Sequence, residues 1–544
     1  MNRFVRSKLV TAVAFALSAG VGISTQVSAA AVDATTGGWL SEDLGDVLLF
    51  PYYTVRDDAN GHPFKTSFTI TNTDALNTIW VKFRLRDSVD SQDVLDFQIM
   101  LSPLDEIVAW MDRDSASGQP RVNFNSDETS CRIPWKGGAT TFTAPGGTVS
   151  VQNAQEGHLE VIPIAALPIA APGGTLNGKL AVHTPGNPTT HAQNCANLSN
   201  IIERGVQATF VTGLGALTIA SGGTPVPNVL RGAYSITSSE SGFSGGGNAI
   251  TIANWDNAAP VGSLAFGQNS NTVTRGAVAA NQVTQLNGAD THQWDHPHLG
   301  DLAITRNIDR GLPVTAGVTL AATSGLGFNG QMNNWSTNPA NGVGIDWVIT
   351  YFTKYLYRDA NGFYGQSSPY NWPAPSYAVA TQQKAAVAGD RTVMPYDPSN
   401  NAVTGAGISP WTKAVGIASG NNGGRCIEAS ISILDREEGF GGGGVSPGVG
   451  TVLCKESNVI AFRTSQDPRP VLRTTPDAVI DATTTNAGMN YGWAKVNVNP
   501  SDVGPANPPG LGVAVGGFSY TLRDLGDPTL AFSAITPNSN MDRP

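Results

Sequence analysis

Three histidines and two aspartates occupy one short stretch of the chain, Asp290-Thr-His-Gln-Trp-Asp-His-Pro-His298. Imidazole and carboxylate groups are ligands that suit Zn²⁺ or Cu²⁺ in proteins. His296 and His298 would lie on the same side of an extended strand, whereas a helix that joined His292 and His296 would meet Pro297. The spacing predicts a metal site at His292, His296 and His298, with a polar surface loop as the alternative interpretation.

Three aspartates, Asp87, Asp90 and Asp93, recur at every third position between two segments with strand-like patterns. Carboxylates gathered at the loop ends of a sandwich domain suit Ca²⁺, which prefers oxygen ligands. This stretch lacks the loop signature of an EF-hand calcium site. Two interpretations stay open, a Ca²⁺ site at these three aspartates and a solvated turn between strands.

Two other segments match hydrolase motifs by residue type but lack the required context. Gly242-Phe-Ser-Gly-Gly246 has the spacing of a nucleophile elbow, with Asp295 and His296 downstream, yet Ser244 is followed by glycines and a strand-like segment where an elbow needs a helix. Asp435-Arg-Glu-Glu438 contains adjacent acids, which would point to opposite faces of a strand rather than form the paired carboxylates of a glycosidase. We assign no catalytic residue from either segment.

The chain contains four cysteines, and an even number outside the cytoplasm usually forms disulfides. Four cysteines allow three connectivities. Pairing by neighbourhood predicts Cys131 with Cys195 and Cys426 with Cys454, and free buried thiols are the alternative.

The elements that must position these residues are mainly β-strands, because apolar and polar residues alternate with period two along much of the chain. The expected strands are 46–55, 67–72, 80–86, 94–101, 106–111, 157–164, 229–236, 249–253, 346–357, 426–434, 452–462, 491–498 and 512–522. Within the third of these, Lys82, Arg84 and Arg86 would share one face exposed to water. Residues 194–204 form the best helix candidate. Abundant glycine and proline, 62 and 34 residues, also favour short strands joined by turns.

We therefore expect an all-β protein with little helix. The closely spaced strands between residues 46 and 111 predict an N-terminal antiparallel β-sandwich of immunoglobulin-like type. The expected domains are a signal peptide at 1–29, this sandwich at 30–165, a Gly/Ser/Asn-rich β region with long loops at 166–340, and a second sandwich-like domain at 341–544.

The first residues have the three-part layout of a secretory signal peptide. Arg3, Arg6 and Lys8 precede the uncharged apolar run Leu9–Ile23, and Val27-Ser-Ala29 supplies the small residues of a cleavage site. Removing this segment leaves 29 basic residues against 42 acidic ones, a net charge of −13. Such an acidic chain is a poor partner for nucleic acid or anionic lipid. No later apolar run reaches membrane-spanning length, so we expect no transmembrane segment in the mature chain.

Several segments together resemble an uncharacterised family of exported proteins of Gram-negative bacteria. The matching segments are 45–54, 82–103, 346–357 and 426–438 together with Leu453 and Cys454. The resemblance implies an exported surface or periplasmic protein with a β-sandwich near its N-terminus, and it supplies no catalytic residues.

Together these patterns favour an exported, non-enzymatic structural or adhesive β-protein at the cell surface or in the extracellular space, with the periplasm as the second choice. Its partners would be envelope components or further copies of itself, and it would need no cofactor. The alternative is a secreted metal-binding protein or hydrolase that acts through the residues from His292 to His298, with Zn²⁺ there or Ca²⁺ at the aspartates.

Overall fold

The computed structural model describes a β-rich core made of many short chain segments. The described residues are 39–41, 44–57, 61–89, 93–133, 140–144, 149–170, 178–183, 188–203, 226–238, 243–253, 330–336, 343–352, 413–414, 425–435, 449–463, 472, 478–481, 491–498, 516–523, 532–537 and 539–540. Residues 1–29, where the signal peptide is expected, lie outside them.

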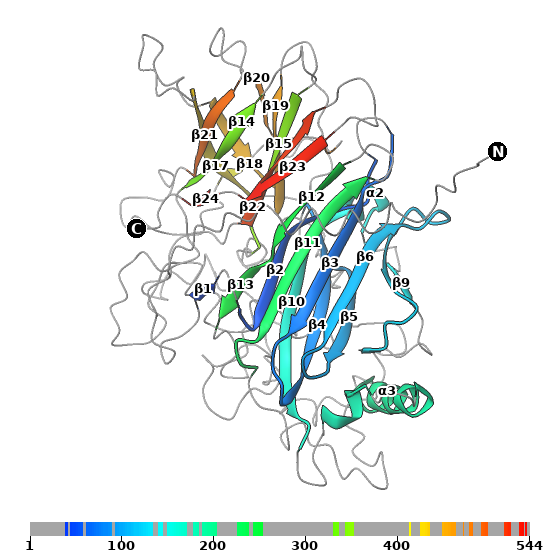
Figure 1. The fold of residues 1–544 in the computed structure, drawn as a ribbon. Helices are drawn as coiled ribbons and strands as arrows, with labels where there is room; N and C mark the ends of the chain where they lie inside the picture. Colours follow the sequence, from blue (N-terminus) through cyan, green and yellow to red (C-terminus); the bar gives the residue numbers. More distant parts are fainter. Residues whose placement is uncertain are drawn as a thin grey trace, which may run out of the picture. The chain divides into compact units, whose positions relative to one another are not determined.

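Two antiparallel sheets form a first sandwich between residues 39 and 253 (Figure 1). The seven-stranded sheet has the order β1 (Trp39–Ser41), β13 (Ile250–Ala253), β2 (Val47–Thr54), β10 (Glu156–Pro168), β4 (Asn77–Asp87), β5 (Asp93–Leu101) and β8 (Cys131–Ile133). The six-stranded sheet has the order β12 (Phe243–Asn248), β11 (Leu230–Ser238), β3 (Lys65–Asn72), β6 (Glu106–Arg113), β7 (Pro120–Phe124) and β9 (Thr141–Thr143). Since β11, β12 and β13 belong to these sheets, the sandwich extends past the expected boundary at residue 165.

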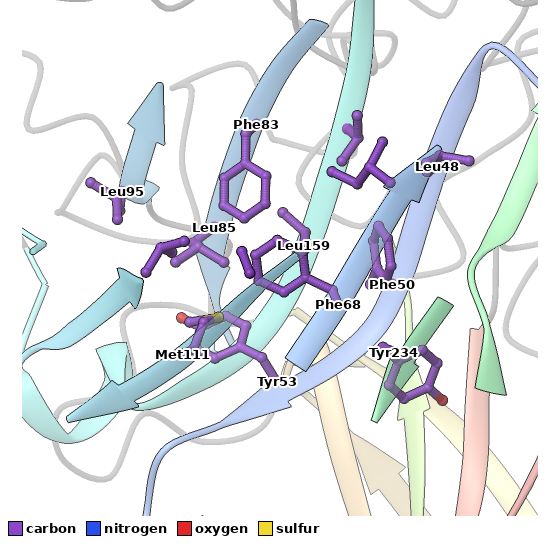
Figure 2. Packing of buried hydrophobic residues seen from close by; sticks show 14 of the residues in the cluster. Leu48, Phe50, Tyr53, Phe68, Phe83, Leu85, Leu95, Met111, Leu159 and Tyr234 are labelled. Atoms are coloured by element: carbon purple, nitrogen blue, oxygen red, sulfur yellow. The ribbon is translucent and has the colours of Figure 1, made fainter. Parts of the chain in front are cut away.

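Aromatic and aliphatic side chains fill the space between the two sheets, among them Phe50, Phe68 and Phe83 (Figure 2). Phe68 from β3 lies 5.0 Å from Phe83 of β4, and Phe83 stacks on Phe97 of β5 at 4.6 Å between ring centroids. Phe97 in turn stacks on Phe142 of β9 at 4.7 Å. In each of these strands every second side chain points to the same face of the sheet. The period-two pattern in the sequence therefore corresponds to the core face of each sheet.

The two sheets differ in their outer faces. Burial alternates along β3 and β11, as it does in a sheet with one wet face, whereas β2, β4 and β10 are buried almost along their whole length. The expectation that Lys82, Arg84 and Arg86 share a wet face is therefore wrong. Their exposed fractions are 2%, 0% and 0%, because the outer face of this sheet is itself covered.

Helical segments cover the apolar part of that outer face. α3 (Pro188–Glu203) and the 3₁₀ turn η1 (Gly178–Ala181) contribute Leu198 and Ala181 to a cluster with Trp80 and Met100 of the sheet. α3 includes most of the helix expected at 194–204 and begins six residues earlier. A single turn, α2 (Val151–Ala154), starts where the Ser150 side chain accepts a hydrogen bond from the Asn153 amide.

A second pair of sheets is built from residues 330–540. One contains β16 (Lys413–Ala414), β17 (Arg425–Asp435), β18 (Val449–Leu453), β21 (Tyr491–Val498), β14 (Gly330–Ser336) and β24 (Ser539–Asn540). The other has the order β20 (Ala478–Asp481), β19 (Ser457–Arg463), β15 (Val343–Thr350), β22 (Gly516–Arg523) and β23 (Phe532–Pro537). Trp335, Trp347 and Phe462 are central to the core of this region.

Residues 452–462, expected as one strand, belong to two. The chain leaves β18 at Leu453 and enters β19 at Ser457, and the Asn458 side chain closes the turn between them by hydrogen bonds with Lys455. The prediction of an all-β, sandwich-type protein with little helix is confirmed. Within the described residues, no helix combines the length and the apolar character needed to cross a bilayer.

Candidate functional site

The residues predicted to bind metal fall mostly where the structure gives no description. His292, His296 and His298 lie outside the described residues, as does Asp90. Asp87 ends β4 fully buried, and its carboxylate accepts a hydrogen bond of 2.6 Å from the Val89 amide. Asp93 begins β5. The Ca²⁺ and transition-metal sites stay predictions, and Asp87 already has a structural role in its turn.

The two hydrolase-like segments have no catalytic geometry in the described residues. Ser244 lies within β12, opposite Thr237 of β11, so it occupies a regular strand rather than a turn between a strand and a helix. Asp435 is the last residue of β17, and residues 436–438 lie outside the description.

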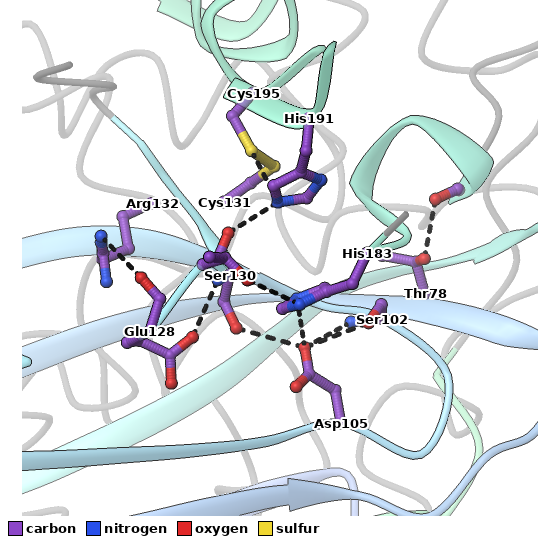
Figure 3. Close-up of a disulfide and its surroundings, with 12 residues drawn as sticks. Thr78, Ser102, Asp105, Glu128, Ser130, Cys131, Arg132, His183, His191 and Cys195 are labelled. Carbon is purple, nitrogen blue, oxygen red and sulfur yellow. Dashed lines mark hydrogen bonds and ion pairs between the residues drawn. A yellow bond between two sulfur atoms is a disulfide. The ribbon is translucent and has the colours of Figure 1, made fainter. Parts of the chain in front are cut away.

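A disulfide joins Cys131 of β8 to Cys195 of α3, as the sequence predicted (Figure 3). Both cysteines are fully buried and belong to the cluster that holds α3 on the outer face of the seven-stranded sheet. Cys454 is disulfide-bonded as well, and its pairing with Cys426 stays a prediction. The ladder between β17 and β18 aligns Ile427 with Leu453, which makes positions 426 and 454 neighbours.

Polar groups gather beside the disulfide, at the end of the sandwich where β5 turns into β6. Asp105 is their anchor, since its Oδ2 accepts hydrogen bonds from the Ser102 amide at 3.0 Å, the Ser102 hydroxyl at 3.2 Å and the Ser130 hydroxyl at 3.2 Å (Figure 3). The preceding residue, Leu104, has φ 58°, which makes it the one non-glycine with positive φ among the described residues. Leucine rarely adopts this conformation, so the turn that presents Asp105 is strained.

Two histidines hold the neighbouring Thr129. His183 Nδ1 lies 2.6 Å from the Thr129 hydroxyl, and His191 Nε2 lies 2.7 Å from the Thr129 carbonyl oxygen. The rings face each other with their centroids 4.9 Å apart. On its other side, His183 places Nε2 3.4 Å from Asp105 Oδ2. The cluster thus contains a carboxylate, an imidazole and a hydroxyl in consecutive contact, and Figure 3 labels the first two, Asp105 and His183.

Asp105 and His183 each favour the charged form of the other. Burial alone would raise the pKa of Asp105, but the contact with His183 and the hydrogen bonds from Ser102 and Ser130 outweigh it and lower that pKa. The same contact with Asp105 raises the pKa of His183 despite its partial burial, and Glu128 adds to the effect. A negative Asp105 beside Nε2 favours the tautomer of neutral His183 that carries its proton there, which leaves Nδ1 as an acceptor for the Thr129 hydroxyl.

Cys131, His191 and Cys195 also have the spacing of a metal site, because one donor atom from each lies within 4.8 Å of the others. The two sulfurs are joined to each other, however, and a metal binds thiolates. The remaining donor, His191 Nε2, is engaged with the Thr129 carbonyl. In this state the three residues form a structural cross-link rather than a metal centre.

Sequence reasoning missed Asp105, Thr129 and His183. They come from three separate loops, and neither their spacing nor their neighbours form a motif. A partial signal was available in His191 and Cys195, which stand four residues apart and therefore share a face of α3. Since Cys195 was expected to pair with Cys131, His191 could have been placed beside that bond.

No family model, no curated protein and no solved structure matches the chain.

Proposed function

We propose that the protein is exported and works as a structural or adhesive β-protein at the cell surface or in the extracellular space. The buried cross-link between β8 and α3 carries the proposal. Disulfides form and persist in oxidising compartments and are rare in the cytoplasm. This one belongs to the packing of the outer face of the sheet, so the fold described here is the fold of an oxidised protein.

The build of the first sandwich supports a structural role. The central strands β2, β4 and β10 of its seven-stranded sheet are buried on both faces, and the sheet is cross-linked to the helix α3 that covers part of it. The ends of the sandwich present loops, and loops on rigid scaffolds are where β-sandwich proteins contact partners. Envelope components or further copies of the chain are the partners that we propose.

The test compares the full chain with a variant that lacks residues 2–29, both produced in a Gram-negative host. Cells are alkylated with a maleimide polymer before and after reduction, and whole cells are treated with protease. We expect the full chain to resist alkylation until reduced and to be cut on intact cells. The shortened chain should remain inside the cell with free thiols. A full chain that stays in the cytoplasm with reduced thiols overturns the proposal.

Metal analysis of untagged protein separates the proposal from the alternative function. A stoichiometric transition metal that is lost when His292, His296 and His298 are replaced by alanine would favour the metal-dependent alternative instead. Sedimentation of the purified protein, alone and with isolated envelope fractions, then distinguishes self-association from binding to the envelope.

A further inference from the structure

We propose that Thr129 is a nucleophile for acyl transfer from carboxylic esters, with His183 as its general base and Asp105 as the residue that positions His183. This activity goes beyond the structural role. The carrying observation is the chain of contacts, a hydrogen-bond distance of 2.6 Å from the Thr129 hydroxyl to His183 Nδ1 and a charge contact of 3.4 Å, without hydrogen-bond geometry, from His183 Nε2 to the Asp105 carboxylate. A hydroxyl, a base within reach of its proton and a third group that orients the base are the parts of an activated nucleophile.

Asp105 and Thr129 are each held in place by groups outside the trio. Three hydrogen bonds from Ser102 and Ser130 fix the Asp105 oxygen that contacts His183. The main chain of Thr129 is fixed through its carbonyl by His191, and the disulfide two residues further on ties the same segment to α3. A nucleophile held by its own backbone keeps its geometry when a substrate binds.

Access and strain point to the same place. Thr129 is exposed and His183 is partly exposed, so a substrate can reach the hydroxyl. The strained φ of Leu104 aims the residue that follows it, Asp105, and strain of this kind concentrates at functional sites. The lowered pKa of Asp105 keeps it negative, as a residue that steadies an imidazolium must be.

The substrate class follows from two exposed leucines. Leu104 and Leu76 are 67% and 70% exposed, and the amides of both donate hydrogen bonds to Asp74, so their turns meet at this end of the sandwich. An exposed apolar side chain beside a polar site can contact the apolar part of a ligand. We assign them to an apolar acyl group.

The reaction balances without a further reagent. The Thr129 oxygen bonds to the ester carbonyl carbon while its proton passes to His183 Nδ1, and the carbon–oxygen bond to the alcohol then breaks as that alcohol takes the proton from His183. Water next gives its proton to Nδ1 and adds to the acyl carbon, and Thr129 leaves with the proton. The products are an alcohol and a carboxylic acid.

The experiment incubates the full chain with p-nitrophenyl acetate and p-nitrophenyl butyrate, following nitrophenol release and the acylated residue by peptide mass spectrometry. We expect one acyl group on Thr129, and a loss of release of roughly 100-fold or more in T129A and H183Q, the usual scale for a general base. T129S should retain the activity. T73A is the matched control, because among the described residues the exposed Thr73 hydroxyl donates a hydrogen bond only to the Val229 carbonyl.

Two further variants test the assigned roles. D105N should shift the pH profile of release to lower pH, since it removes one of the groups that face His183, the others being Glu128, Thr129 and His191. The parent protein should release nitrophenol faster from the butyrate ester than from the acetate ester, and L104A should remove that difference while leaving acetate turnover in place. Circular dichroism verifies the fold of each variant. Acylation on lysines alone, or equal rates in T129A and the parent protein, overturns the proposal.

Discussion

Arg86 donates a hydrogen bond of 2.8 Å to Glu160 in a place where both side chains are fully buried. The pair spans neighbouring strands on the covered face of the seven-stranded sheet, and His158 Nε2 lies 3.7 Å from the other Glu160 oxygen. Burial alone would raise the pKa of Glu160, but Arg86, His158 and Arg84 outweigh it and lower that pKa to about 2. The carboxylate is therefore ionised in the folded protein at neutral pH.

The first prediction concerns acid. The pKa of Glu160 is lower in the folded chain than its usual 4.5, so its contribution to stability is present above about pH 4.5 and is lost as the pH falls towards 2. The difference corresponds to about 3 kcal/mol. Chemical denaturation at about pH 6 and about pH 2.5 should show this loss. In E160Q the slope over the same interval should be shallower, and an unchanged slope would count against the assignment.

The second prediction concerns the pair itself at neutral pH. E160Q removes the negative charge from this buried pair, which should cost about 3–5 kcal/mol of unfolding free energy. D57N is the control, because it breaks the ion pair between Asp57 and Arg113, whose side chains are 33% and 31% exposed. That change should cost less than about 1 kcal/mol. Equal losses of unfolding free energy in E160Q and D57N would mean that burial does not determine how much an ion pair contributes to stability.

The third prediction concerns the cross-link. Replacing Cys131 and Cys195 by serine frees a loop closed across a sequence separation of 64 residues. Without the cross-link the unfolded chain gains conformational entropy. This gain should destabilise the folded protein by about 4 kcal/mol. Denaturation measured without reductant tests this value. Peptide mapping under the same conditions should recover the 131–195 pair and, as predicted from sequence, the 426–454 pair.

The fourth prediction concerns Gly157, which lies at an irregular point in the pairing of β10 with β2. A Cβ on Gly157 would lie 1.8 Å from the Arg86 carbonyl oxygen, so the two strands would have to separate. G157A should cost about 3 kcal/mol or more. On Gly247 of β12 the added atom would meet the Tyr234 ring at an ordinary 3.6 Å, and G247A should change stability by less than about 1 kcal/mol. The midpoints of urea unfolding compare them directly.

The fifth prediction concerns His183. Its pKa lies above the ordinary 6.5 because of the contact with Asp105, so its contribution to stability is present below that value and is lost as the pH rises through the folded pKa. Titration of the imidazole by NMR should show the raised pKa, with a decrease in D105N and a smaller one in E128Q. A pKa that is unchanged in D105N would remove Asp105 as its cause.

The strand pattern could be predicted because alternation records which residues face a core, and Phe68 and Ile70 of β3 show it plainly. The covering of an outer face could not, since Lys82, Arg84 and Arg86 alternate like exposed residues while their counterparts His158 and Glu160 occur far along the chain. The same limit applies to the Thr129 cluster. Its members meet only because the disulfide and α3 bring three loops together.

The position of β11 and β13 in the chain has a consequence for the time course of folding. β11 pairs with β3, and β13 pairs with β1 and β2, so both sheets of the first sandwich remain unfinished until residue 253 has arrived. Contacts between such distant segments form slowly, because the intervening chain must lose its freedom before they contribute. The first sandwich can therefore close only late, after residue 253 has been made, and such late closure is compatible with the export that we propose.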